Sequence, residues 1–172
     1  MMNPGNLKVS TPSDLEIAMT RDFNAARELV FEAITQADLV KKWLLGPPGW
    51  SMPVCEIDLR VGGAYRYLWR SDADGTEMGT RGVFREIVKP ERVVCTEKFD
   101  QAWYPGEGLI TNSLVENAGR TTLTLNVLYE TREARDMALK SGMDKGVEMS
   151  FNRLEQLVLS TAAAGAKEGR ES

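Results

Sequence analysis

The sequence predicts an α+β fold in which a seven-stranded antiparallel sheet curls around a long C-terminal helix. Three observations predict it. After a first short strand, hydrophobic residues follow a helical period of 3.6 up to about residue 45 and then alternate with a period of 2 from residue 52 to residue 130. The alternating runs are joined by short turns, which connect antiparallel neighbours. The last long segment returns to a helical period and needs an apolar surface to cover.

The chain length predicts one domain. With 172 residues, of which 42% are apolar and 27% charged, the chain has the composition of a globular protein. A chain of this size buries roughly 70% of its unfolded surface, so its core requires neither a metal nor a disulfide. We expect a flexible leader over residues 1–12, the domain over residues 13–163 and a frayed tail over residues 164–172.

The first elements are a strand and two short helices. Leu15, Ile17 and Met19 alternate with polar or small residues, which predicts a strand with one buried face. Asn24 can cap the helix that follows, because its side chain can accept from a free backbone N–H. A second short helix is expected over residues 36–45, and the Gly-Pro-Pro-Gly sequence at 46–49 ends it.

Six further strands follow, rich in Val, Ile, Thr and aromatic residues. Their turns contain Gly, Pro, Asn and Asp, the residues that favour tight turns. The strands are expected at residues 52–59, 64–71, 78–88, 92–99, 109–116 and 121–130.

The C-terminal part predicts a short helix and then a long one. Thr131 is the expected cap of the short helix, which ends at Ser141-Gly142. The long helix, over residues 144–163, has one apolar stripe formed by Val147, Phe151, Leu154 and Val158. Because a twisted sheet cannot contact this helix along its whole length, we expect a pocket between them.

Charge and composition exclude several functions. The net charge of −4 gives no attraction to phosphate, so we expect neither nucleic acid nor a membrane as a partner. With no apolar run of about 18 residues and no signal sequence, a cytoplasmic location is the expectation. The chain contains no His, which excludes Ser-His-Asp triads and His-ligated metal sites. We expect no metal and no cofactor, and no catalytic residue is identified.

Aromatic residues are the best candidates for binding. Tyr65, Tyr67 and Trp69 share one face of a strand, and inward Tyr hydroxyls need hydrogen-bond partners that a ligand could supply. Trp43, Trp50 and Trp103 lie in or beside loops, and Phe151 lies on the long helix. The complete set of candidate ligand-binding residues is Trp43, Trp50, Tyr65, Tyr67, Trp69, Trp103, Asn126 and Phe151. The alternative is that these rings are packed in the core or hold loops in place.

Carboxylates and cysteines suggest no reaction. Glu56 and Asp58 share a strand face, where pairing with neighbouring Arg side chains in solvent is favoured over an acid–base pair. Cys55 and Cys95 lie in separate strands, and we expect reduced, buried thiols.

Segments along most of the chain, from about Ser13 to Ala163, resemble a known family. The matching segments are Val30–Thr35, Leu39–Trp43, Glu56–Tyr67, Gly82–Ile87, Pro90–Val94, Thr121–Leu125 and Ser141–Leu157. In order and spacing they resemble the activator-of-heat-shock-protein-ATPase-like branch of the START-like (SRPBCC) superfamily. The resemblance implies a helix-grip fold with a cavity between sheet and helix that takes apolar molecules, and it transfers no catalytic residue.

We therefore expect a cytoplasmic domain that binds a small hydrophobic or aromatic molecule. One alternative is a cyclase, dehydratase or hydrolase that uses a carboxylate in the pocket. Another is a protein-interaction module of the co-chaperone type. An exposed edge strand also makes a homodimer possible.

Overall fold

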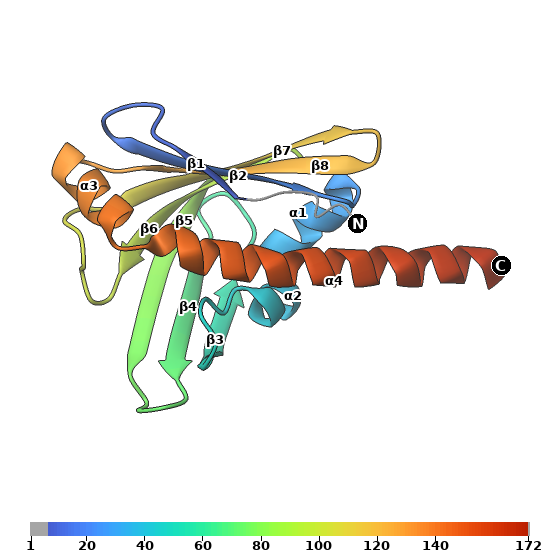
Figure 1. The fold of residues 1–172 in the computed structure, drawn as a ribbon, viewed down its shortest axis with the longest axis horizontal. Coiled ribbons are helices and arrows are strands. Elements are labelled where there is room, and N and C mark those ends of the chain that lie inside the picture. The colour runs from blue at the N-terminus through green and yellow to red at the C-terminus, as the bar shows by residue number, and fades with distance from the viewer. Residues whose placement is uncertain (1–6, 172) are drawn as a thin grey trace.

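Eight antiparallel strands form one sheet that bends around a long helix, as the computed structural model of residues 7–171 shows (Figure 1). The α+β, helix-grip architecture is confirmed. The strands are β1 (Lys8–Ser10), β2 (Glu16–Phe23), β3 (Trp50–Ile57), β4 (Ala64–Ser71), β5 (Glu77–Val88), β6 (Arg92–Phe99), β7 (Gly108–Asn117) and β8 (Arg120–Leu128). The helices are α1 (Arg27–Thr35), α2 (Ala37–Trp43), α3 (Arg132–Lys140) and α4 (Met143–Glu171).

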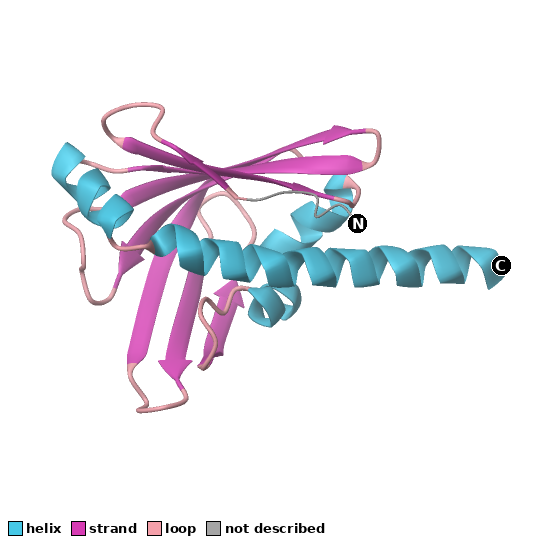
Figure 2. Ribbon diagram, in the orientation of Figure 1, coloured by secondary structure: helices cyan, strands magenta, loops and turns pink. Residues whose placement is uncertain are grey.

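The sheet is a consecutive meander from β3 to β8, and the N-terminal strands join it at the far end. The strand order is β1-β2-β8-β7-β6-β5-β4-β3, so β2 pairs with β8 and not with β3. The two short helices α1 and α2 connect β2 to β3 across the open side of the sheet (Figure 2). Helix α4 lies along the concave side of the sheet (Figure 1).

Strand alternation places one apolar row across five strands. Each residue of this row lies opposite the next one on the neighbouring strand, and all of them are buried. The row consists of Ile17, Val127, Ile110, Cys95 and Phe84. Because side chains on one face of a strand recur every second residue, this row fixes which residues of each strand face the concave side.

Helix α4 packs against the sheet and the short helices through the stripe that the sequence predicts. The Phe151 ring lies 5.7 Å from the ring centroid of Phe23 and 6.0 Å from that of Trp43. Leu154 and Val158 are fully buried one and two turns further on. The stripe therefore joins α4 to both β2 and α2, because Phe23 and Trp43 belong to those elements.

Three predictions about the ends of elements are wrong. The sheet has an eighth strand, β1, in the segment expected to be part of a flexible leader; residues 1–6 lie outside the described part. Helix α4 continues to Glu171 and does not stop near Ala163, so the segment expected to fray is helical up to that residue. Asn24 does not cap α1, because the helix begins at Arg27 and its N-cap position is taken by Ala26, which has no side-chain oxygen to accept a hydrogen bond.

The predicted cap of α3 is confirmed, and it gives a first stability prediction. The Thr131 side chain accepts a hydrogen bond from the Ala134 backbone N–H at 3.0 Å. Thr131→Ala should lower the free energy of unfolding by about 1 kcal/mol, the usual cost of losing such a cap. Urea unfolding followed by circular dichroism measures the change. Thr131→Ser keeps the hydroxyl and should lose less than half as much; equal losses in both variants would contradict the capping role.

Candidate functional site

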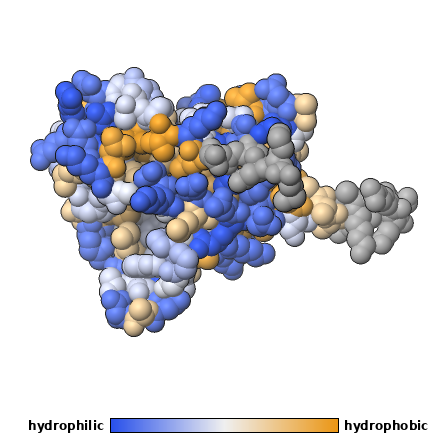
Figure 3. All heavy atoms as spheres, viewed as in Figure 1, coloured by the Kyte–Doolittle hydropathy of each residue, from blue (hydrophilic) through white to orange (hydrophobic). Residues whose placement is uncertain are grey.

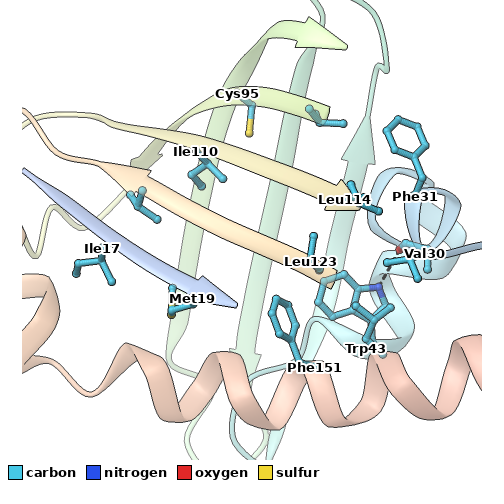
Figure 4. Packing of buried hydrophobic residues seen from close by; sticks show 14 of the residues in the cluster. Ile17, Met19, Val30, Phe31, Trp43, Cys95, Ile110, Leu114, Leu123 and Phe151 are labelled. Atoms are coloured by element: carbon cyan, nitrogen blue, oxygen red, sulfur yellow. Dashed lines mark hydrogen bonds between the residues drawn. The ribbon is translucent and has the colours of Figure 1, made fainter. Parts of the chain in front are cut away.

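A cavity of about 430 Å³ lies between the concave face of the sheet and the helices α2 and α4. Its walls are mostly apolar. Figure 4 shows Cys95, Ile110 and Leu123 on the strands and Trp43 and Phe151 on the helices, all facing this interior. The prediction of a hollow between sheet and helix is therefore confirmed as a geometric feature.

The cavity exists because α4 is held away from part of the sheet. The helix packs chiefly on α1 and α2, while β4 and β5 extend away from it (Figure 1). Small residues then leave the space unfilled: Gly146 lines the cavity from α4 and Thr80 lines it from β5. A Cβ atom added at Gly146 would meet no atom within 4 Å. The sheet curvature and these small side chains together produce the hollow.

Seven of the eight predicted binding residues line this cavity. They are Trp43, Trp50, Tyr65, Tyr67, Trp69, Trp103 and Phe151. The prediction is wrong for Asn126, which does not line the cavity. It lies on β8 between Leu125 and Val127, which line the cavity, so its own side chain points to the other face and donates to the Glu16 carboxylate at 2.9 Å.

Two of the tryptophans fix the positions of backbone segments beside the cavity. Trp43 donates from Nε1 to the Ala33 carbonyl at 2.8 Å, which ties α2 to α1. Trp69 donates from Nε1 to the Leu44 carbonyl at 2.7 Å, which ties β4 to the end of α2. Each ring therefore has an apolar surface in the cavity and a satisfied polar atom. The alternative expected from the sequence, that the rings hold backbone segments in place, applies to Trp43 and Trp69. Both residues also form part of the cavity wall.

The tyrosines differ in how their hydroxyls are satisfied. Tyr65 is buried and its hydroxyl donates to the Thr96 carbonyl at 2.6 Å. Burial raises the pKa of both Tyr65 and Tyr67 far above the usual value, so both remain neutral hydroxyls. Within residues 7–171, the Tyr67 hydroxyl and the Asn112 side-chain amide make no hydrogen bond, and both residues line the cavity. They are available to a ligand.

Glu97 is the functional candidate that the sequence did not reveal. It lies on β6 and lines the cavity, and the Tyr104 hydroxyl donates to its Oε1 at 3.3 Å. Burial raises the pKa of Glu97 to about 7, because the surroundings disfavour the charged form, and the Tyr104 hydrogen bond opposes this only in part. A signal existed in the alternation of Val93, Cys95, Glu97 and Phe99, which places a carboxyl on the apolar face of its strand.

Glu56 and Asp58 lie as the sequence predicts, and so does Cys95, which is buried, whereas the Cys55 thiol is only half-buried. Glu56 is exposed, and Asp58 accepts a hydrogen bond from Arg60 Nε at 2.8 Å on the surface. Both cysteines are free, and burial raises the pKa of the Cys95 thiol to about 12. The described residues contain no group of three or more His, Cys, Asp or Glu side chains placed to hold a metal ion. No helix in the described part of the chain has the length and hydrophobicity needed to cross a membrane.

Solved structures with the same fold come from several bacteria. A Rhodobacter sphaeroides protein is 28% identical, covers 91% of this chain and 99% of its own, and superposes with a TM-score of 0.85. A Chromobacterium violaceum protein is 27% identical over 85% of this chain and 98% of its own, with a TM-score of 0.71. A Mycobacterium smegmatis protein, 22% identical over 91% of this chain and 99% of its own with a TM-score of 0.79, shows the fold alone.

A search of curated proteins gives no match to this chain. The family model described as "Activator of Hsp90 ATPase homolog 1-like protein" matches residues 24–159, which include α1 to β8 and most of α4. The chain therefore belongs to the activator of Hsp90 ATPase homolog 1-like family, within the START-like (SRPBCC) superfamily.

Proposed function

We propose that this protein binds a small hydrophobic or aromatic molecule in the cavity between its sheet and helix α4. The observation that carries the proposal is the cavity itself, about 430 Å³ in volume and lined largely by apolar and aromatic side chains. Ligand sites in proteins have this size and this composition, with a few polar groups that orient the ligand. Tyr67 and Asn112 supply such groups.

The apolar area that a ligand can bury is sufficient for measurable affinity. A ligand that loses about 250 Å² of apolar surface gains about 6 kcal/mol, at about 25 cal/mol per Å² and before ordering costs. This free energy corresponds to a dissociation constant in the tens of micromolar. Because ordering costs weaken this value, we expect a dissociation constant of tens of micromolar or higher for a ligand that the cavity can enclose.

Tryptophan fluorescence tests the proposal directly. The chain has four tryptophans, Trp43, Trp50, Trp69 and Trp103, and all four line the cavity. Titration with pentylbenzene should change their emission in a saturable way, and isothermal titration calorimetry should give one site per chain. Benzyl alcohol, which buries less apolar area, is the matched control and should bind at least tenfold more weakly. A titration with neither heat nor an emission change would remove the proposal.

An acid–base enzyme is a second candidate because Glu97 offers a carboxyl with a pKa of about 7 inside the cavity. A group that titrates near neutral pH can both accept and donate a proton. The discriminating measurement is native mass spectrometry of the protein from its own host, followed by incubation of any co-purified molecule with fresh protein. Recovery of the molecule unchanged supports a binding function, whereas conversion to a product supports the enzyme.

The family name also points to a co-chaperone, which was expected as an alternative. The test is the ATPase rate of Hsp90 from the same host, measured with a stoichiometric excess of this protein. We expect no stimulation, because the proposed function uses an interior cavity. As part of the same proposal we place the protein in the cytoplasm, where the free thiols Cys55 and Cys95 would stay reduced.

A further inference from the structure

We propose that the cavity selects an apolar molecule carrying one protonated amine, and that the amine binds to the carboxylate of Glu97. This inference rests on the proposed function and adds the chemical class of the ligand.

Glu97 is the one charged side chain among the described residues that line the cavity. The titratable groups around it are the hydroxyls of Tyr65 and Tyr67 on β4, the hydroxyl of Tyr104 in the loop after β6 and that of Tyr129 after β8, together with the thiol of Cys95. Burial raises the pKa of each of them, so all are neutral near pH 7. The wall thus holds one acid and no base. A cationic ligand would gain an attraction there, and an anionic ligand would be repelled.

Aromatic rings next to Glu97 add to the preference for a cation. Tyr104, which donates to Glu97, lies edge-on to Trp103 with ring centroids 4.7 Å apart. Trp103 in turn lies 5.5 Å from Phe99, which follows Glu97 on the same face of β6. The faces of Trp, Tyr and Phe rings attract cations, and the attraction grows when water is excluded. A carboxylate beside such rings is suited to an ammonium group.

The sheet lets Tyr104 reach the Glu97 carboxyl. Glu97 pairs across the strands with Gly108 on β7, which contributes no side chain of its own. A Cβ atom at Gly108 would lie 3.1 Å from the Tyr104 hydroxyl oxygen and 3.3 Å from Val127 Cγ1, so these two side chains occupy the place above the glycine. Glycine therefore lets Tyr104 and Glu97 meet, and Glu97 forms part of the cavity wall, where a ligand can contact it.

The predicted ion pair has a defined pH window. Glu97, with a pKa of about 7, is mostly neutral below pH 6 and mostly charged above pH 8. An alkylamine remains protonated up to about pH 10, as Lys does. The Glu97 carboxylate and the amine are therefore both mostly charged between about pH 8 and pH 10. The preference for an amine over a hydrocarbon should increase from pH 6 to pH 8, because the carboxylate forms over that range.

Three probes of matched size test the inference by calorimetry: phenylbutylamine, pentylbenzene and phenylpentanoic acid. At pH 8 we expect the amine to bind about tenfold more tightly than the hydrocarbon, and the acid to bind more weakly than both. Glu97→Gln keeps an acceptor for Tyr104 but removes the charge. This variant should lose the tenfold preference while binding pentylbenzene within about twofold of the unmodified protein. Glu56→Gln, which removes an exposed carboxylate, should change none of the affinities.

The outcomes separate the inference from the function on which it rests. Equal affinity for amine and hydrocarbon at pH 6 and pH 8, or an unchanged amine preference in Glu97→Gln, would overturn the inference while leaving the binding function intact. Tighter binding of the acid would overturn it as well. If none of the three probes binds, both proposals fail. The pH series uses the unmodified protein, so the result does not depend on how well Glu97→Gln folds.

Discussion

Gly146→Phe is expected to weaken the binding of pentylbenzene at least tenfold. Gly146 lies near the start of α4 and lines the cavity. No atom lies within 4 Å of the position that its Cβ would take, so the new ring has room to occupy part of the 430 Å³ that a ligand would otherwise fill. A tenfold loss corresponds to about 1.4 kcal/mol, which is close to what the burial of half a phenyl ring contributes at most. Isothermal titration calorimetry measures the change.

Gly146→Ala is the matched control. It removes the same helical glycine, which should stabilise α4 by about 0.5–1 kcal/mol, but it adds only a methyl group to the cavity wall. We expect its affinity for pentylbenzene to stay within about twofold of the unmodified protein. Normal binding by a folded Gly146→Phe protein would show that the ligand lies elsewhere.

Leu154→Ala should have the largest effect on stability, a loss of about 3 kcal/mol in the free energy of unfolding. Leu154 is fully buried in the stripe of α4 and is not part of the cavity wall, so its removal leaves a new void in packed surroundings. Substitutions of buried Leu by Ala typically cost about 2–5 kcal/mol, more where the surroundings cannot close the gap. Urea unfolding followed by circular dichroism gives the difference.

The control for Leu154 lies on the same helix. Leu159 is 37% exposed, so Leu159→Ala makes the same change in helix propensity but removes less packing than Leu154→Ala. It should cost less than half as much as Leu154→Ala. Similar losses at both positions would mean that α4 is not anchored by its apolar stripe.

Most of the fold could be predicted because its signals are local. The alternation around Tyr65 and the stripe around Phe151 reflect a period of 2 and a period of 3.6, which depend only on backbone geometry. The end of α4 could not be predicted this way. Gly165 indicates a helix end, yet one glycine costs only about 1 kcal/mol, and the helix continues past it. Strand β1 depends on pairing with β2, which no short segment encodes.

The binding residues could be predicted only where residue type and strand face agreed. Tyr67 and Trp69 are aromatic and lie on the strand face opposite to Arg66 and Arg70, so chemistry and geometry indicate the same side. The sequence suggests Asn126 for its amide, but Asn126 alternates with the inward Leu125 and Val127 and must point outward. Glu97 shows the opposite case, since a charged residue is expected at the surface. The alternation along β6 gives the strand face of Glu97, but only the packing of β6 with its neighbours and with the helices shows that this face meets a cavity.

The surface also shows why an interior site is the stronger expectation. Hydrophilic atoms dominate the face in Figure 3, with a smaller group of hydrophobic atoms among them. Edge strand β1 has three residues, and edge strand β3 contains Pro53 and an irregular register, both of which weaken pairing between sheets. Association through these edges is thus less favoured than the sequence alone suggested.

The pairing of β2 with β8 has a consequence for synthesis on the ribosome. Ile17 pairs with Val127, so until nearly three quarters of the polypeptide has emerged the first long strand, β2, has only the three-residue strand β1 as a neighbour in the sheet. During that time its apolar face is open to other nascent chains, and pairings between segments so distant along the chain form slowly. Helper proteins that shield nascent segments should therefore raise the yield of this protein more than the yield of a meander in which every long strand pairs with the next.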